Sequence, residues 1–564
     1  MRAICSDQTR PEVERAARLG RAAIGAAKNI ITPVLITPIR RATERPSFTT
    51  YEETAGRSFK RAWPSLIKLD EMVQKKVACW IEPTKLITMK QGCPSRHEFW
   101  LCAGAIFTIL VVAAAIRIRG ALNDLWLDEI WSLNLVREIS SPRAVFTGIH
   151  QENNQYLNSL CLYFLGPHGN WPGYRIPSLM AGMGSVVLAW LIGRRRSVPC
   201  AFFAMLLVGF SYVMVLYSSE ARGYAALVFF SFLTFYVLER HLEKPCWTTA
   251  GLLSFSEVMG FLSHLTFFYF FCAVMVWSGW RFARSNPGFK RASASMLAGH
   301  ALPLLVFGWL YFVDIRVLVM GGGTPSSLIK VYDDALAWTV GFPGGVPPLA
   351  VALAVVVVFG AGLWLLGRER SVLPVFFVCV MIAPVLMIVI KHHQFIYVRY
   401  FLISMAFALI LISFLLGWLY ERGRMGKGIC LLFLAAYFLA NGWHMMALFR
   451  DGRGHYGEAA RMIAEQSKGS VVTIRCENDF RISTVLQFYI PGVMGDRTVK
   501  YYQNDLWPKD GPEWVICYKE SFEDPLPPGT QFTDPAGNSY ELFRTFPTAP
   551  LSGLHWFVYH AQIK

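Results

Sequence analysis

The chain has 564 residues, which is more than one ordinary soluble domain. Hydrophobic residues make up 54% of it and charged residues only 16%, a balance that argues against a purely water-soluble protein and is typical of a polytopic membrane protein. The formal net charge is +16, which in such a protein reflects cytoplasmic loops rich in Lys and Arg. No nucleic-acid-binding motif accompanies this charge, so we expect no nucleic-acid partner.

The N-terminal segment, residues 1–97, contains no apolar run long enough to cross a membrane. It is basic, and we predict a disordered cytoplasmic extension. Two alternatives stay open: part of 11–41 lies on a membrane surface as an amphipathic helix, or the true start is Met89. Because the first apolar segment begins only near Glu98, we predict no cleaved signal peptide.

About eleven apolar segments follow and predict an all-α polytopic membrane module over residues 98–449. Basic loops such as Arg194–Arg196 fall on one side, which the positive-inside rule makes cytoplasmic. The polar loop 119–174 and the C-terminal segment are then expected on the opposite side. The predicted spans are 98–118, 176–193, 198–217, 222–239, 247–263, 265–281, 296–317, 347–366, 372–390, 399–419 and 428–448.

Hydropathy drops at the C-terminal end, where residues 450–564 predict a small periplasmic domain of α/β type. Glu458–Gln466 has helical character, and Ser470–Arg475 and Glu513–Tyr518 resemble short strands. Cys476 and Cys517 fall in this domain and could pair, although the sequence alone does not decide it.

The acidic pair Asp128–Glu129 directly follows the first span and is flanked by tryptophans. Carboxylates beside a membrane are costly unless they are paired or used. Such a carboxylate can act as a general base toward a hydroxyl or phosphate nucleophile, so both residues are catalytic candidates. The alternative is a pair of ordinary loop charges or a helix start.

Further polar residues are predicted at the same side of the membrane. Glu220, Arg222 and Tyr224 lie between two spans, where the two charged residues could pair with each other or orient a polar substrate. His264 lies between two apolar runs, either as a packed, hydrogen-bonded residue or as a metal ligand with Glu152 as its carboxylate partner.

Several cationic or proton-donating residues occur together at another outer boundary, in Lys391–Tyr400. Arginine holds phosphate through paired hydrogen bonds and lysine acts as a point charge. Arg399, Lys391 and Tyr400 are therefore candidates for binding a lipid phosphate, and His393 for binding substrate. Snorkelling anchors are the alternative, but the positive-inside bias disfavours Arg399 on this side.

Five motifs together resemble the GT-C superfamily of membrane glycosyltransferases. Within that superfamily, the chain is similar to bacterial relatives of the protein O-mannosyltransferases, to the lipid A aminoarabinose transferase and to lipopolysaccharide-core galacturonosyltransferases. The resemblance covers about 98–450, and its strength lies in the order and spacing of the motifs. The motifs are Leu125–Glu129, Tyr174–Leu179, Ser219–Tyr224, Ser263–His264 and Tyr397–Tyr400.

The resemblance implies a glycosyltransferase in the bacterial inner membrane, with its active site facing the periplasm. The donor would be a polyprenyl-phosphate-linked sugar and the acceptor an envelope glycolipid, glycan or protein, with inversion at the anomeric carbon. Asp128 matches the catalytic or acceptor-orienting carboxylate of the family. Arg399, with Lys391, would stabilise the departing polyprenyl phosphate.

The resemblance also implies that Glu152 and His264 could hold a divalent metal, as in the aminoarabinose transferase; no other cofactor is expected, and the mannosyltransferase branch works without a metal. This chain has Glu152–Gln155 where the aminoarabinose transferase carries a Lys-Pro-Pro segment, which argues against aminoarabinose as the sugar.

Two other functions stay as alternatives. A transporter or flippase of lipid-linked sugars should show internal repeats and broken helices near the membrane midplane, and no repeat is visible in the sequence. A non-catalytic scaffold would leave Asp128, Glu129 and Arg399 without a role.

Overall fold

The structure is a computed structural model that describes residues 96–562 with short gaps. The gaps are 167–170, 285–288, 320, 322–324, 342–346, 369–372, 392–394, 505 and 521–528. The predicted extension 1–97 lies outside the described residues except for its last two positions.

Eight helices in the described ranges are long and apolar enough to cross a membrane, or nine if a bent pair counts as one span. The chain is therefore a multi-pass membrane protein. The eight are α3 (Arg96–Ala121), α8 (Ile176–Arg194), α11 (Tyr224–Glu243), α14 (Phe289–Val313), α16 (Pro348–Arg368), α17 (Leu373–Lys391), α18 (Leu402–Tyr420) and α19 (Arg424–Asp451).

The bent pair is formed by α9 (Val198–Phe210) and α10 (Tyr212–Ser218), whose axes differ by 59°. Two further helices, α12 (Trp247–Ser263) and α13 (Phe267–Arg284), coincide with predicted spans but are not among the eight. Every predicted apolar segment is thus helical, while the number eleven stays a prediction.

The break between α9 and α10 falls at Ser211 and leaves backbone groups of both helix ends without helical partners. Side chains of two other helices satisfy them. Asn441 of α19 accepts from the Tyr212 amide at 2.7 Å, and Tyr437 donates to the Leu207 carbonyl at 2.7 Å. The Arg117 guanidinium of α3 donates to the carbonyls of residues 208 and 209. A broken span is tolerated inside a membrane only where its backbone is satisfied in this way.

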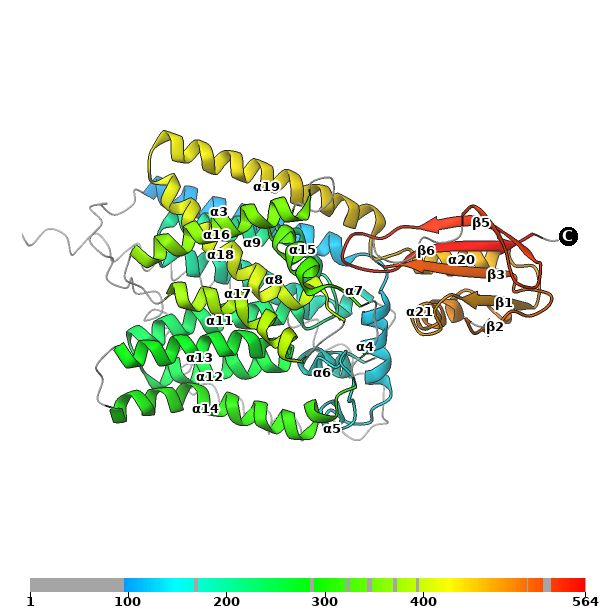
Figure 1. The fold of residues 1–564 in the computed structure, drawn as a ribbon, viewed down its shortest axis with the longest axis horizontal. Coiled ribbons are helices and arrows are strands. Elements are labelled where there is room, and N and C mark those ends of the chain that lie inside the picture. Colours follow the sequence, from blue (N-terminus) through cyan, green and yellow to red (C-terminus); the bar gives the residue numbers. More distant parts are fainter. Residues whose placement is uncertain are drawn as a thin grey trace, which may run out of the picture. The chain divides into compact units, whose positions relative to one another are not determined.

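The first long loop folds into short helices at one end of the bundle (Figure 1). They are α4 (Leu127–Arg137), α5 (Ala144–Thr147), α6 (Tyr156–Leu165) and α7 (Trp171–Tyr174). The loop is tied to the chain that follows α14 by a bridge between Gln151 and Val319. The next helix of that connection is α15 (Leu328–Val340). None of the short helices is long enough to span, as the sequence predicted.

The C-terminal segment forms a six-stranded mixed sheet with α20 (Tyr456–Gln466) and α21 (Arg481–Tyr489) (Figure 1). The predicted helix and both predicted strands are confirmed. Strands β2, β1 and β3 are parallel, whereas β3, β6, β5 and β4 pair antiparallel. In spatial order they are β2 (Thr498–Tyr502), β1 (Val471–Cys476), β3 (Trp514–Lys519), β6 (His555–Ala561), β5 (Ser539–Phe546) and β4 (Gln531–Thr533).

The apolar core of this domain continues into the first loop of the membrane module. Leu125 and Ile130 beside the acidic pair belong to the same buried cluster as Ile463 of α20, Val485 of α21 and Trp514 of β3. The loop that carries the acidic pair is therefore packed on both sides, by the bundle and by the C-terminal domain.

Cys476 and Cys517 do not form a disulfide; both are free and buried. Cys476 pairs in register with Ile516, so Cys517 points to the opposite face of the sheet. The two thiols belong to separate apolar clusters on these faces.

We predict that Asn441→Leu destabilises the bundle. The substitution removes the acceptor of the Tyr212 amide and the donor to the Val340 carbonyl, and a buried backbone group without a partner costs about 1–3 kcal/mol. Thermal unfolding in detergent should show a lower midpoint than wild type. Tyr437→Phe is the matched control, because it removes only the contact to Leu207 and should cost less. Equal midpoints for N441L and wild type would contradict this account of the break.

Candidate active site

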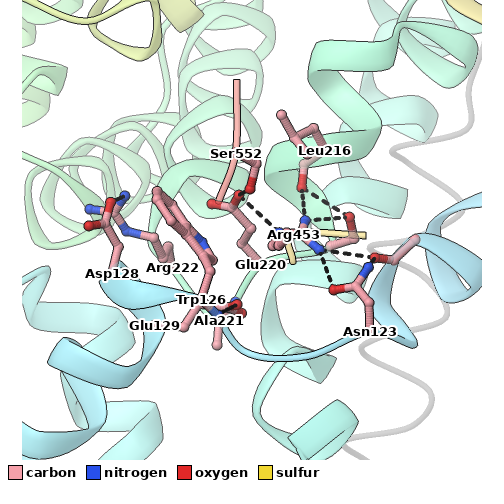
Figure 2. Close-up of polar contacts among 12 residues, drawn as sticks. Asn123, Trp126, Asp128, Glu129, Leu216, Glu220, Ala221, Arg222, Arg453 and Ser552 are labelled. Carbon is pink, nitrogen blue, oxygen red and sulfur yellow. Dashed lines mark hydrogen bonds and ion pairs between the residues drawn. The ribbon is translucent and has the colours of Figure 1, made fainter. Parts of the chain in front are cut away.

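Asp128 lies in the first turn of α4, where the helix dipole favours a carboxylate. Its Oδ2 atom accepts from Arg222 Nη1 at 2.5 Å and lies 3.5 Å from Arg399 Nη1. Its Oδ1 atom receives no hydrogen bond from any residue of the described ranges. Three segments distant in sequence thus meet at one carboxylate, which the sequence predicted only as a shared membrane face. Figure 2 shows the Asp128–Arg222 pair.

Asn153 fixes the geometry of this pair. Its Nδ2 atom donates to the Asp128 carbonyl at 2.8 Å and to Ser132 Oγ at 2.9 Å, while its Oδ1 accepts from Arg222 Nη2 at 2.8 Å. The guanidinium of Arg222 is therefore held by Asp128 on one nitrogen and by Asn153 on the other. Arg222 also lies over the Tyr224 ring, 4.9 Å from its centroid.

Glu129, the neighbour of Asp128, is fully buried and saturated with hydrogen bonds. Arg175 binds both of its oxygens, from Nε at 2.8 Å and Nη2 at 2.6 Å, and the Ala221 amide donates to Oε1 at 2.7 Å. Burial alone would raise the pKa of Glu129, but the charge and hydrogen bonds of Arg175 outweigh it and the pKa is lowered. This geometry favours a structural role for Glu129, in place of the catalytic role that the sequence suggested.

Glu220 pairs with Arg453 instead of Arg222. Its Oε1 atom accepts from Arg453 Nε at 3.2 Å and from Ser552 Oγ at 3.1 Å (Figure 2). The side chain is fully buried, and burial raises the pKa of this carboxyl against the lowering effect of Arg453. The sequence grouped Glu220 with the substrate-binding residues, but the structure joins it to the C-terminal domain.

Tyr224 and His264 pack against each other, with ring centroids 4.8 Å apart. The His264 Nδ1 atom accepts from the Thr266 amide at 3.2 Å. Burial, together with the charges of Arg222 and Arg399, lowers the pKa of His264 to about 3, so the imidazole is neutral at physiological pH. The residue is therefore packed and hydrogen-bonded, and its role as a metal ligand stays a prediction.

Among the described residues, the predicted metal pair gains no further ligand. Burial raises the pKa of the Glu152 carboxyl, and the nearby charges of Arg399 and Arg222 offset this only in part. Glu152 therefore lies within electrostatic reach of the charged cluster. Within the described parts of the chain, no group of three or more His, Cys, Asp or Glu side chains is placed to hold a metal ion. Two donors alone do not match the usual metal coordination in proteins. The metal stays a prediction that this donor set does not fit, and no chemistry is derived from it.

The remaining candidates lie around the start of α18. Arg399 and Tyr400 belong to the 3₁₀ turn η3 (Val398–Phe401), and the Arg399 guanidinium lies 4.2 Å from the Tyr397 ring centroid. Lys391 is the last residue of α17 and is exposed. His393 lies outside the described residues.

The site residues carry an unusual share of unpaired polar atoms. In the described ranges, nine buried side-chain nitrogen or oxygen atoms have no hydrogen-bond partner, and five of them belong to residues of the loops around Asp128. Four of the five are donors. They are Trp126 Nε1, Gln155 Nε2, Arg222 Nε and Arg399 Nε, and the one acceptor is Glu220 Oε2.

Three site residues carried signals that the sequence analysis did not use. Arg175 and Asn153 stand in the motifs Tyr174–Leu179 and Glu152–Gln155, but no role was assigned to either. Arg453 stands between Gly452 and Gly454 at the end of the last span, and both glycines have positive φ, 58° and 123°. An arginine between two such glycines is a sign of close backbone packing.

Comparisons with known proteins give distant likenesses. No protein-family model matches the chain, and no curated protein matches it in sequence. The structure of ArnT from Cupriavidus metallidurans in the apo state matches with 11% identity and a TM-score of 0.47, over 74% of this chain and 93% of that one. The structure of the same protein bound to undecaprenyl phosphate gives 12% and 0.46, over 75% and 93%. Such distant likeness establishes no shared activity, so function has to be inferred from the residues of this chain.

We predict that Glu129→Gln lowers the free energy of unfolding, by about 3–5 kcal/mol if the buried pair with Arg175 is effectively broken. Asp128→Asn should cost less, because the Asp128 side chain retains 11% exposure whereas Glu129 is fully buried. Because the pKa of Glu129 is lowered from 4.5 in the folded chain, its stabilisation is complete above pH 4.5 and is lost as the pH falls through the lowered value. Unfolding midpoints measured in detergent from pH 7 to well below pH 4.5 should therefore fall at the acid end in wild type and depend less on pH in E129Q. A midpoint for E129Q equal to that of wild type throughout would rule out this structural role.

Proposed function

We propose that this protein is an inverting glycosyltransferase that moves a sugar from a polyprenyl-phosphate donor to an envelope glycolipid, glycan or protein. We place it in a bacterial inner membrane with the site facing the periplasm. The observation that carries the proposal is the Asp128 carboxylate, which two arginines hold through one oxygen at the end of a membrane bundle while its other oxygen stays without a partner in the described residues.

The environment of Arg399 supports a lipid-phosphate ligand. Arg399 lies at the start of an apolar span, where a charge is costly unless it has a partner or a function. Within the described residues its one ion pair with a carboxylate is the long contact to Asp128, and its Nε atom is buried without a partner. A phosphate could accept from this Nε and from a second nitrogen of the same group, since guanidinium groups bind phosphate through two parallel hydrogen bonds.

The proposed step needs no protein nucleophile. An acceptor hydroxyl or phosphate oxygen attacks the anomeric carbon, the bond from that carbon to the phosphate oxygen breaks, and polyprenyl phosphate leaves with the bonding electron pair. When the acceptor is a hydroxyl, Asp128 Oδ1 takes its proton. Arg399 stabilises the charge that develops on the leaving phosphate, and Lys391 and Tyr400 are candidates to assist it.

The roles of the other residues follow from their contacts. Arg222 and Asn153 hold Asp128 in one orientation, and Tyr224 supports the Arg222 guanidinium. The unpaired donors of Trp126 and Gln155 favour substrates with many oxygen acceptors, as sugars have. The identity of the sugar and of the acceptor are not assigned.

One observation favours the alternative of a transporter or flippase. The bent pair α9–α10 is a broken helix of the kind expected for such a protein. However, Asn441 and Tyr437 satisfy the backbone groups at the break, so these groups are not available to a substrate. The charged cluster lies instead at one end of the bundle. Purified protein in liposomes separates the two functions: a flippase moves the labelled donor across the bilayer without an acceptor, whereas a transferase releases polyprenyl phosphate only when an acceptor is present.

We expect Asp128→Asn to lower the turnover number roughly a hundred- to ten-thousand-fold, the range for loss of a general base. Release of polyprenyl phosphate from a labelled polyprenyl-phosphate sugar measures this, with unfolding midpoints as the check on folding. Activity of D128N equal to wild type would remove the proposed base.

Arg399→Ala should act mainly on the donor. Losing a charge-assisted contact to phosphate is expected to raise the KM for donor or the Kd for undecaprenyl phosphate roughly ten- to a hundredfold. Arg422→Ala is the matched control, because Arg422 lies over the Trp418 ring at the other end of α18. Unchanged donor binding in R399A would remove the phosphate role.

A further inference from the structure

The connection between β5 and β6 of the C-terminal domain enters the membrane module. Within it, the Pro550 carbonyl accepts from the Tyr212 hydroxyl at 2.5 Å, and Ser552 Oγ donates to Glu220 Oε1 at 3.1 Å. The Ala549 amide donates to the Gly452 carbonyl at 2.9 Å. The segment 549–554 is thus bound at three points to the ends of membrane helices.

The backbone of this segment is adapted to a close approach. Gly553 has a φ of +79°, and a Cβ atom at this position would overlap the Arg453 carbonyl oxygen. Leu551 has a φ of +62°, the only positive value at a non-glycine residue in the described ranges. Such a conformation costs free energy and persists only where the surroundings enforce it. The docking of this segment is therefore specific and not a loose contact.

Arg453 connects the docked segment to the loops of the site. Its side chain is fully buried, and all three of its nitrogens donate hydrogen bonds. The five acceptors come from the end of α3, the first loop, the end of α10 and the segment that follows it. They are Gly120 O, Asn123 Oδ1, Leu216 O, Ser219 Oγ and Glu220 Oε1.

Glu220 is two residues from Arg222, the partner of Asp128. The residue between them, Ala221, donates its amide to Glu129 Oε1 at 2.7 Å. Three successive residues of one short segment thus contact the C-terminal domain, the structural carboxylate and the candidate catalytic carboxylate (Figure 2). The position of Glu220 therefore constrains the position of Arg222.

The Glu220 carboxylate depends on few contacts. Its Oε2 atom is buried without a hydrogen bond in the described chain, so its orientation rests on Oε1 and on the two donors Arg453 Nε and Ser552 Oγ. If the serine hydroxyl is removed, only one bond of 3.2 Å remains. A buried carboxylate with so few partners has a strong tendency to reorient.

We propose that the C-terminal domain sets the geometry of the active site, and that Ser552 is a positioning residue that acts on Asp128 through Glu220 and Arg222. The catalytic consequence rests on the proposed glycosyl transfer, whereas the structural coupling does not. The C-terminal domain then contributes directly to the geometry of the active site.

The coupling is tested by hydrogen–deuterium exchange of the full-length protein in detergent, comparing Ser552→Ala with Ser467→Ala. Ser467 is the matched control, because it is similarly buried in the same domain and loses one hydrogen bond, from Trp514 Nε1 at 2.8 Å. Its side-chain hydrogen bond in the described chain stays within the C-terminal domain. We expect faster exchange of the 219–223 amides in S552A and wild-type exchange in S467A. Unchanged exchange of this segment in S552A, or an equal change in S467A, overturns the coupling.

The catalytic consequence is tested by turnover of the same variants. S552A should lower kcat roughly five- to tenfold, as expected for one lost hydrogen bond, with little change in KM for the donor. Ser552→Thr, which keeps the hydroxyl, should recover most of the rate. A loss that appears equally in S467A, or one confined to KM, overturns the positioning role. If wild type transfers no sugar, the proposed function fails, while the exchange result still decides the coupling.

Discussion

Buried arginines at the end of the membrane bundle constrain the rest of the structure. Arg175, Arg222 and Arg453 are each removed from water, and a buried charge is tolerated only when it is paired and hydrogen-bonded. Each pairs with a carboxylate that is far from it in sequence, so each pair fixes two segments of the chain to each other. Asn123 links two of them, because its Oδ1 accepts from both Arg175 and Arg453. The loops of the site have little freedom once these pairs have formed.

The same constraint separates the carboxylates by role. Glu129 and Glu220 are fully buried, and the hydrogen bonds on them come from groups that hold the fold together. In Asp128, both arginines contact the same oxygen, Oδ2, and the side chain retains 11% exposure. Glu129, whose two oxygens are both occupied, cannot also take a proton from a substrate, and the open Oε2 of Glu220 is fully buried, whereas Asp128 has an open oxygen on a side chain that is not fully buried. The environment, and not the residue type, therefore distinguishes Asp128 from its neighbour.

Much of this could be predicted from the sequence, because hydropathy reports helices directly. Every predicted apolar segment is helical, and Asp128, Arg222 and Arg399, which the sequence predicted only at one membrane face, lie within ion-pair distance. The partners of the glutamates could not be predicted. Glu220 is two residues from Arg222, which suggests a local pair, but its partner lies 233 residues away and is brought there by the last span. The break at Ser211 was also invisible, since its stabilising partners come from other helices.

The atoms that the fold leaves unpaired also bear on function. Most buried polar groups in native proteins have partners, because an unpaired one costs free energy. Here Arg175 and Arg453 use all their nitrogens, while Arg222 and Arg399 beside Asp128 each keep a buried Nε without a partner in the described chain, as Arg117 and Arg475 do elsewhere. This difference is not explained by burial, since Arg222 is buried like the others. At the candidate site it is explained if a ligand rich in oxygen acceptors completes the hydrogen bonds, because binding would then recover a cost that folding left in place there.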